Sequence, residues 1–232
     1  ANTHTASSKS YPGVTALSGG GFAVVWTSAN QDGDGNGVFS QRFDASGTPV
    51  GTEIQVNSTT ADSQTLSSVA GLQSGGFVAA WSSWNQDGSG WGTYAQTFDA
   101  NGTAAGSEFL VNNTTSGSQV WVNLTALDDG GYLAVWLSGN QVVSQRFDAA
   151  GVEVGTETIV NTNAAGPLYS PDASSLSGGG YVVTWTVLNQ DGSSYGVYGQ
   201  QYASDGSPVG TEFLINSTTA NSQLWQDVAG LG

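Results

Sequence analysis

The feature that most constrains this sequence is an apolar run that opens with two glycines, closes with a tryptophan and occurs four times. The copies cover residues 20–26, 75–81, 130–136 and 179–185. A short V-x-x-L-like segment precedes each copy, and a fifth such segment begins at Val228; successive segments start 55, 55, 49 and 55 residues apart. A period of this length is typical of propellers and other arrays in which each repeat is one supersecondary unit.

Each period contains four segments that the residue pattern predicts to be strands. In the first copy they cover residues 14–17, 22–26, 38–43 and 53–57. The third segment alternates apolar and polar side chains, as a half-buried strand does, whereas the second is apolar at nearly every position. Helical periodicity is absent. The sequence therefore predicts an all-β fold, a β-propeller of four four-stranded blades in which the recurring tryptophans pack between blades.

The repeats form a single domain, residues 1–232, with a surplus first strand. They cover about 14–68, 69–123, 124–172 and 173–227, with a partial fifth copy at 228–232. A closed ring of four blades needs only four first strands. Either a terminal strand is displaced, or another chain completes the ring, or the chain is an open arc of a longer array. An open arc exposes an apolar end, so further copies of the chain are an expected partner, and the alternative fold is an arc completed by oligomerisation.

Composition excludes several classes of partner. The chain has 18 acidic residues against 3 basic ones, which gives a formal net charge of −15. So few cations cannot neutralise a phosphate backbone or an anionic membrane surface, so we expect no nucleic-acid partner. No apolar run is long enough to span a bilayer, so we expect no membrane insertion. Cysteine is absent, so no disulfide holds the fold.

The loop after the second strand of the first repeat is a candidate calcium site. Its residues Asp32, Asp34 and Asn36 alternate with glycines, as in the opening half of a calcium loop. The match is incomplete, because Phe43 stands where a closing Glu would be needed. The alternative is an Asp-Gly turn that links two strands and needs no metal.

The equivalent loops of the second and fourth repeats contain aromatic residues that break the repeat pattern. Aromatic faces beside Asn, Gln and Asp side chains are typical of sugar recognition, because the ring stacks on C–H groups while polar side chains hold hydroxyls. The alternative is that the rings cover a blade edge. The candidate ligand-binding residues are Trp84, Asn85, Gln86 and Trp91 in the second repeat, with Asn189, Gln190 and Tyr195 in the fourth.

Other recurring residues have a structural interpretation. Carboxylates recur before the fourth strand and after the third, and two carboxylates at a suitable separation can hydrolyse a glycoside. Because every copy has the same pair, we expect structural roles for them and no catalytic residue. Trp121 and Trp225 share another register, which we interpret as packing between blades. The recurring carboxylates are Glu53, Glu108, Glu157 and Glu212, with Asp44, Asp99 and Asp148.

The repeat as a whole resembles one found in very large secreted bacterial proteins of the haemolysin-type (RTX) and adhesin kind. The resemblance rests on the string G-G-F-x-V-x-W, then N-Q-D-G-x-G-x-G-V-F/Y-x-Q-R-F-D-A-x-G and V-G-T-E-F/I-x-V-N, in four copies over essentially the whole chain. It implies an extracellular or cell-surface location with calcium in the surroundings. The calcium-binding nonapeptide of those proteins is absent here, so the resemblance assigns calcium to no named residue.

From these observations we expect a non-enzymatic extracellular module that mediates adhesion or carbohydrate binding through the loops after the second strand of each blade. Its partner would be a polysaccharide or surface glycan. The alternative is a structural or assembly repeat of a large secreted or surface protein. A third hypothesis is a glycan-active enzyme that uses the recurring carboxylates.

Overall fold

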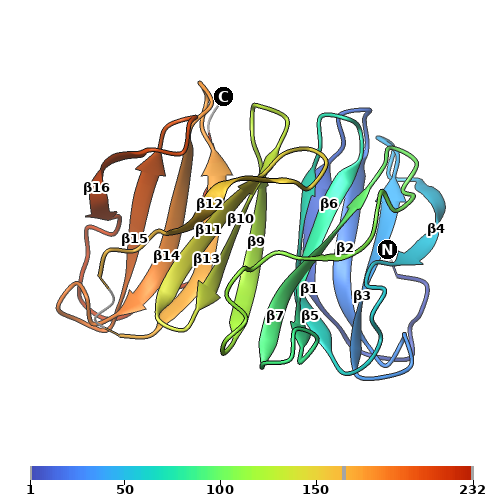
Figure 1. Ribbon diagram of the computed structural model, residues 1–232, viewed down its shortest axis with the longest axis horizontal. Coiled ribbons are helices and arrows are strands. Elements are labelled where there is room, and N and C mark those ends of the chain that lie inside the picture. The colour runs from blue at the N-terminus through green and yellow to red at the C-terminus, as the bar shows by residue number, and fades with distance from the viewer. Residues whose placement is uncertain (1, 164–165, 231–232) are drawn as a thin grey trace.

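The computed structural model describes residues 2–163 and 166–230, which form strands and no helix. The strands make four four-stranded antiparallel sheets, each built from consecutive strands of one repeat (Figure 1). Within each sheet the chain moves outward strand by strand, from the first strand of the repeat to the fourth. The prediction of a propeller fold with four-stranded blades is confirmed.

The blades have similar strand lengths, with one exception. Blade one contains β1 (Lys9–Ala16), β2 (Phe22–Ala29), β3 (Asn36–Phe43) and β4 (Pro49–Gln55). Blade two contains β5 (Gln64–Gly71), β6 (Phe77–Trp84), β7 (Trp91–Phe98) and the short β8 (Phe109–Leu110). Blade three contains β9 (Gln119–Ala126), β10 (Tyr132–Ser138), β11 (Gln141–Phe147) and β12 (Glu153–Ile159). Blade four contains β13 (Leu168–Ser175), β14 (Tyr181–Leu188), β15 (Tyr195–Tyr202) and β16 (Pro208–Leu214).

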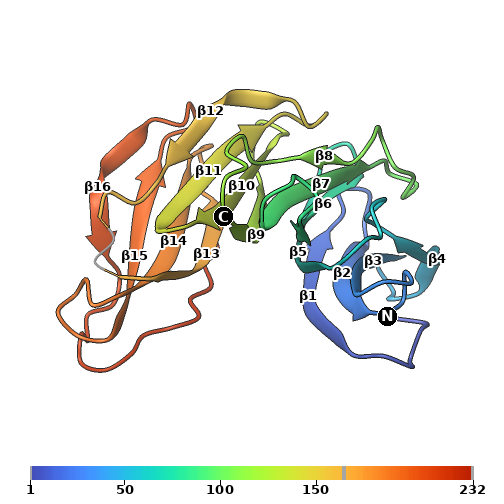
Figure 2. The ribbon, with the colours of Figure 1, turned by 60° about the horizontal axis from the view of Figure 1, so that its bottom comes forward.

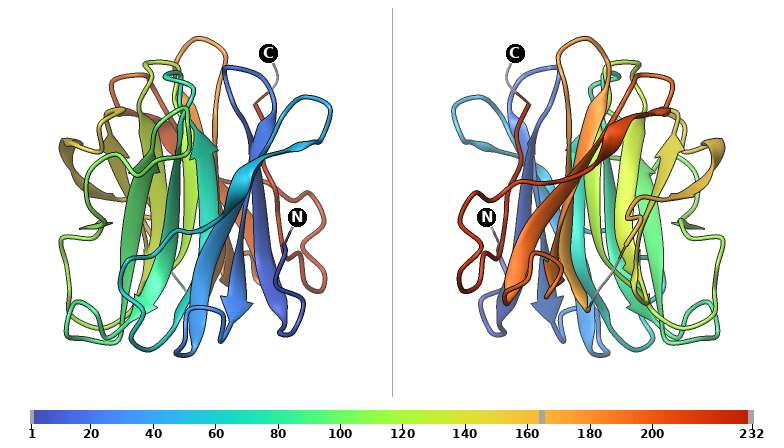
Figure 3. Two further views of the ribbon diagram at one scale, coloured as in Figure 1. Left: turned by 90° about the vertical axis from the view of Figure 1, so that its right-hand side faces the viewer. Right: turned by 90° about the vertical axis from the view of Figure 1, so that its left-hand side faces the viewer.

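The blades follow one another along an arc, and the ring is not closed (Figure 2). The first strands β1, β5, β9 and β13 line the concave side, while β4, β8, β12 and β16 lie outermost. The end-on views show blade one in front from one side and blade four in front from the other (Figure 3). The structure is therefore the open arc, and completion of the arc by oligomerisation remains a prediction.

The core lies between successive blades. Trp81, Trp136 and Trp185 are at most 1% exposed, and Trp26 in the terminal blade is 3% exposed. Trp81 packs among side chains of blades one and two, and the equivalent tryptophans of blades three and four occupy the next two interfaces. Burying an indole ring this completely removes a large apolar area from water, so these tryptophans hold neighbouring blades together. The prediction that the recurring tryptophans pack between blades is confirmed for Trp81, Trp136 and Trp185, whereas Trp26 is buried in the terminal blade outside these clusters.

The first strands begin about five residues earlier than predicted, because each is interrupted by a β-bulge. In blade one the pairing of β1 with β2 shifts between Ser10 and Gly13, and the other blades shift at the equivalent place. A bulge inserts unpaired residues and breaks the alternation of side chains along the strand. The sequence pattern therefore predicted only the part of each strand that follows the bulge.

The surplus first strand is represented by residues 223–230, which we call the C-terminal segment; residues 231–232 of the partial fifth copy lie outside the described residues. The segment belongs to no sheet, but it lies along β13 in the register that neighbouring first strands use. The Gly230 N–H donates to Ser174 Oγ at 2.7 Å, as the equivalent Gly71 N–H donates to Thr15 Oγ1 at 2.9 Å. The segment thus occupies the position of the first strand of a fifth blade.

Candidate functional site

The three residues of the predicted calcium loop are each engaged by other parts of the protein. Asp32 accepts a hydrogen bond from Asn57 Nδ2 at 3.2 Å and closes over the backbone of Gly37. Asp34 accepts one from the Asp62 N–H at 3.1 Å, and Asn36 is the first residue of β3, paired with Ala29. Among the described residues no group of three or more His, Cys, Asp or Glu side chains is placed to hold a metal ion. Calcium binding remains a prediction.

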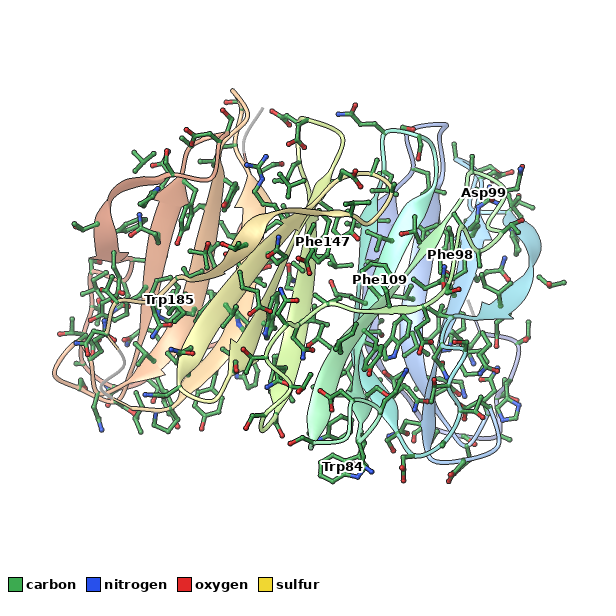
Figure 4. All side chains as sticks on the ribbon, viewed as in Figure 1. Trp84, Phe98, Asp99, Phe109, Phe147 and Trp185 are labelled. Carbon is green, nitrogen blue, oxygen red and sulfur yellow. The ribbon has the colours of Figure 1, made fainter. Side chains whose placement is uncertain are left out.

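The predicted aromatic site of the second repeat is a local pair at a blade edge. Trp84 and Trp91 face each other across β6 and β7 with ring centroids 5.2 Å apart in an edge-to-face arrangement. Trp84 is 43% exposed and projects from the lower edge of the molecule (Figure 4), whereas Trp185 is fully buried between blades three and four. Asn85 has a positive φ of 55°, and its equivalents Asn30 and Asn189 share that conformation. Asn tolerates this left-handed turn, which accounts for its recurrence without a ligand.

The glutamines of these loops are held by the recurring glutamates. Gln86 Nε2 donates to Glu108 at 2.5 Å, and Gln190 Nε2 donates to Glu212 at 2.5 Å. Glu108 also accepts bonds from the Ser58 N–H and hydroxyl, which lie just after the preceding blade. These glutamates tie the chain between blades to the next blade, so their structural interpretation is confirmed.

The recurring aspartates stabilise the turn between the third and fourth strands. Asp44 accepts hydrogen bonds from the Ser46 and Thr48 N–H groups, each at 2.9 Å. The Ser46 hydroxyl bond and these N–H groups hold the pKa of Asp44 below its usual value, and the Thr103 N–H does the same for Asp99. The prediction of a structural role is confirmed here too.

Tyr195, the remaining predicted residue, lies elsewhere. It contacts Tyr169 edge to face at 5.5 Å, and a hydrogen bond between their hydroxyl groups raises the pKa of Tyr195. Both rings line a hollow of about 220 Å³ with Trp121, Ser170, Leu224 and Trp225, which we call the aromatic pocket. The structure therefore separates Tyr195 from Trp84 and Trp91, although Tyr195 and Trp91 are equivalent in the repeat.

The bulges of the first strands bring unusual backbone to the concave side. One residue in each bulge, and its equivalent in the C-terminal segment, has a positive φ although none is glycine. Large side chains in this conformation are rare and cost about 1–3 kcal/mol each, so they are most often found at functional sites. The five residues are Tyr11, Leu66, Trp121, Ser170 and Trp225, with φ between 47° and 62°.

These residues also surround a second hollow of about 270 Å³, which we call the carboxylate pocket. Tyr11, Leu66, Trp121 and Ser170 line it, together with Asn123, Asp172, Gln226 and Asp227. The two pockets share Trp121 and Ser170. The two hollows adjoin at these residues of the first strands, and we refer to them together as the axial groove. We interpreted Trp121 and Trp225 as blade packing, but Trp225 is 67% exposed at this groove.

Asp172 and Asp227 form a carboxylate pair in the axial groove. Asp172 accepts hydrogen bonds from the Ala173 N–H at 2.9 Å and from the Val228 N–H at 3.0 Å. Burial is the main cause that raises the pKa of Asp172 to about 6, and the neighbouring Asp227 carboxyl adds to the effect. A carboxyl with this pKa holds a proton in mildly acidic solution and can donate it to a bound molecule.

Sequence reasoning missed this pair, although a signal was present. Asp172 and Asp227 occupy one register of the repeat, where the earlier copies have Gly13, Ser68 and Asn123. The register lies one residue before each predicted first strand, in a stretch that we had read as a connecting loop. The departure of the last two copies from the first three was the signal that would have found them.

A larger hollow, of about 610 Å³, lies between the outer strands of blades three and four. Its carboxylate, Glu212, is engaged by Thr162 and Gln190. It is lined by repeat residues in their usual structural roles and does not contain a carboxylate pair. The axial groove is therefore the better candidate, because strained backbone, aromatic rings and two carboxyl groups converge there.

Comparison with known proteins identifies the fold. No family model and no curated protein matches the sequence. Solved structures do match: a thermostable family-43 glycoside hydrolase has a TM-score of 0.60 at 11% identity, over 94% of this chain and 75% of the hydrolase. The Hadza microbial sialidase Hz136 has a TM-score of 0.55 at 12% identity, over 93% of this chain and 47% of the sialidase. This chain thus spans about half the length of the sialidase.

A third similar structure comes from work on the GH130 family of mannoside phosphorylases, described as containing glycoside hydrolases that target β-1,2 mannosidic linkages in Candida mannan. It has a TM-score of 0.51 at 12% identity, over 89% of this chain and 70% of that one. At such identities the likeness establishes the fold alone.

The comparison corrects our expectation of a non-enzymatic adhesion module with a structural repeat as its alternative. Several of the similar propellers are described as glycoside hydrolases, and one as a sialidase. The expectation that the chain is not an enzyme was wrong because it considered only the carboxylates that recur in register between copies, and these hold turns and connections. A carboxylate pair that departs from the repeat lies in the groove.

The described residues form no helix long and apolar enough to cross a membrane.

Proposed function

We propose that this chain cleaves glycosidic bonds in the axial groove, with Asp172 as the proton donor. The observation that carries the proposal is the Asp172–Asp227 pair beside an aromatic wall, at positions where the other copies have no carboxylate. The propeller fold supports it, because glycoside hydrolases and a sialidase are built on similar propellers. The partner is accordingly a polysaccharide or another glycan.

In the proposed step, Asp172 gives its proton to the glycosidic oxygen as the bond from that oxygen to the anomeric carbon breaks. A water molecule adds to the anomeric carbon and releases a proton to the Asp227 carboxylate. Paired carboxylates of glycosidases stand about 5–9.5 Å apart, so the substrate must part the two groups. Asp227 is exposed and lies on the C-terminal segment, which belongs to no sheet. It is therefore the group that moves.

The test measures release of reducing ends from a panel of polysaccharides by the wild-type chain and by Asp172→Asn. Replacing Asp148 with Asn gives a matched control, because Asp148 is an exposed turn carboxylate that accepts the Ala150 and Val152 N–H groups. We expect hydrolysis by the wild type and by the control, and hydrolysis about 10²–10⁴-fold slower by Asp172→Asn. A folded wild-type chain that cleaves nothing in the panel, or an Asp172→Asn variant with full activity, would contradict the proposal.

We also infer that copies of the chain associate end to end. Val56, Val111 and Val160 are 1–5% exposed beneath the next blade, while the equivalent Ile215 of blade four is 47% exposed. At the opposite end of the arc Val14 is 68% exposed, although its equivalents in the other blades are buried. Light scattering should show mass rising with concentration, and Ile215→Asp should abolish the rise. A wild-type monomer at high concentration would contradict this inference.

The extracellular location is likewise a proposal, supported by the acidic composition and by the polysaccharide partner. Fractionation of cells that produce the protein, with detection outside the cytoplasmic fraction, tests it.

A further inference from the structure

The aromatic pocket adjoins the carboxylate pair and has the character of a binding site for a sugar ring. Trp121 and Trp225 lie with their ring centroids 6.1 Å apart on one side, and Tyr169 and Tyr195 contact each other at 5.5 Å. The pocket is lined almost entirely by apolar surface and opens to solvent at Trp225, which is 67% exposed. Aromatic faces in such a hollow bind the C–H face of a sugar ring by stacking.

The two pockets are placed for linked rings. Because the two pockets share Trp121 and Ser170, a sugar ring bound in the aromatic pocket would lie next to a sugar ring bound in the carboxylate pocket. Volumes of about 220 and 270 Å³ are each below the range of about 300–1,000 Å³ usual for a complete small-molecule site. The groove therefore suits successive units of a glycan chain, with the bond between them near Asp172.

The charges around the groove select against acidic sugars. The chain has only three cationic side chains besides its single histidine, and none of the three lines either pocket of the groove. Lys9 Nζ donates to the Ser7 carbonyl at 2.9 Å, Arg146 pairs with Asp129 at 2.7 Å, and Arg42 packs beside Gly102 on the outer side of the blades. A sugar carboxylate or sulfate entering the groove would meet Asp172 and Asp227 with no cation to bind it. The net charge of −15 opposes its approach as well.

We propose that the axial groove takes an uncharged glycan, with one ring stacked in the aromatic pocket on Tyr195 and Trp225. The proposal rests on the glycosidase function proposed above and names its substrate class. Sialic acids, uronates and sulfated sugars are excluded as the unit bound there.

The test measures both binding and cleavage of matched soluble oligosaccharides, neutral ones such as manno-, xylo- and arabino-oligosaccharides against oligouronates and sialylated oligosaccharides. The variants are Tyr195→Ala, Tyr195→Phe and Trp225→Ala. Trp91→Ala is the matched control, because Trp91 occupies the register of Tyr195 in blade two but packs on Trp84. Trp225→Ala is included because the Trp225 ring is mostly exposed, so this variant should still fold even if Tyr195→Ala does not.

We expect the wild type to bind a neutral oligosaccharide, and Tyr195→Ala and Trp225→Ala each to weaken that binding about two- to tenfold, the effect of losing one aromatic contact. Tyr195→Phe and Trp91→Ala should bind as the wild type does. Equal binding of acidic oligosaccharides, binding unaffected in both alanine variants, or no binding of any member overturns the proposal. Neutral binding without cleavage supports the substrate class and contradicts the glycosidase function. Cleavage confined to acidic glycans supports the glycosidase function and contradicts the substrate class.

Discussion

The aspartates of the outer turns and the aspartates of the axial groove have the same side chain in opposite settings. Asp44, Asp99 and Asp148 occur at one register in three copies, are exposed, and accept N–H groups of their own turns. Asp172 and Asp227 occur only in the last two copies of another register, in a hollow beside aromatic rings. The pKa is lowered for Asp44 and Asp99 and is raised to about 6 for Asp172.

The difference shows how to separate structure from function in a repeat protein. A residue that every blade needs, such as a turn carboxylate, solves a problem that every blade has. A substrate is bound at one place, so its site is made where single copies depart from the repeat. The same contrast holds for Trp91 and Tyr195, which share a register and lie in different surroundings.

The largest expected effect is on catalysis. Asp172→Asn removes the proton donor and should lower kcat/KM by about 10²–10⁴-fold, the usual contribution of general acid catalysis. Activity of the wild type should also fall as the pH rises above about 6, because Asp172 then loses its proton. Rates of reducing-end release from pH 4 to pH 8 measure both. A decline of the rate below pH 6 that is absent above it would contradict the assigned role.

A core substitution should lower stability rather than chemistry. Trp81→Ala leaves a cavity between blades one and two and should cost about 3–5 kcal/mol in the free energy of unfolding. Trp84→Ala is the matched control, because Trp84 lies three residues further along the chain and is 43% exposed, so its loss should change stability little. Denaturant unfolding followed by tryptophan fluorescence compares the two. Equal losses in the two variants would show that the interface between blades is not the core.

The carboxylate pair of the axial groove should also affect how the stability of the fold depends on pH. The pKa of Asp172 is raised from 3.8 to about 6 on folding, so its stabilising contribution is complete below about pH 4 and is lost as the pH rises through 6. The loss should be about 1–3 kcal/mol, allowing for solvent screening of a partly exposed group. Unfolding free energies of the wild type minus those of Asp172→Asn should therefore fall between pH 4 and pH 7. A flat difference would contradict a raised pKa for Asp172 in the folded chain.

The sequence predicted the blades because the residues that pack them repeat. The glycines, the apolar run and its tryptophan gave the second strand in every copy, and the deletion between Ser138 and Gln141 fell in a loop as expected. The axial groove was not predictable in the same way. Bulges at Tyr11 and its equivalents break the alternation on which strand recognition depends. The direction in which a side chain points after a bulge follows only from the backbone structure, which the sequence pattern does not provide.

Tyr195 and Trp91 have different surroundings because their neighbours on adjacent strands differ, and comparing the two residues at their own repeat position does not reveal this. Blade two has Trp84 opposite Trp91, and blade four has Leu188 in that place. Blade four has Tyr169 on its first strand where blade two has Thr65. Trp91 therefore packs on the strand beside it, while Tyr195 contacts Tyr169 and reaches the groove. We predicted a ligand-binding role for both, and only Tyr195 lies in the groove.

The smallest expected effect is at the turns, with the opposite pH dependence. Hydrogen bonds from the Thr103 and Asn101 N–H groups lower the pKa of Asp99 below 3.8, so its contribution is present above about pH 4 and is lost as the pH falls through its folded value. Asp99→Asn should lower the melting temperature slightly at pH 7 and should have no effect near pH 2. Because Asp172 gains stability from protonation and Asp99 loses it, the two difference curves should have opposite slopes. Thermal melts of both variants at a series of pH values decide the point, and parallel slopes would show that the two classes of aspartate do not differ as the structure indicates.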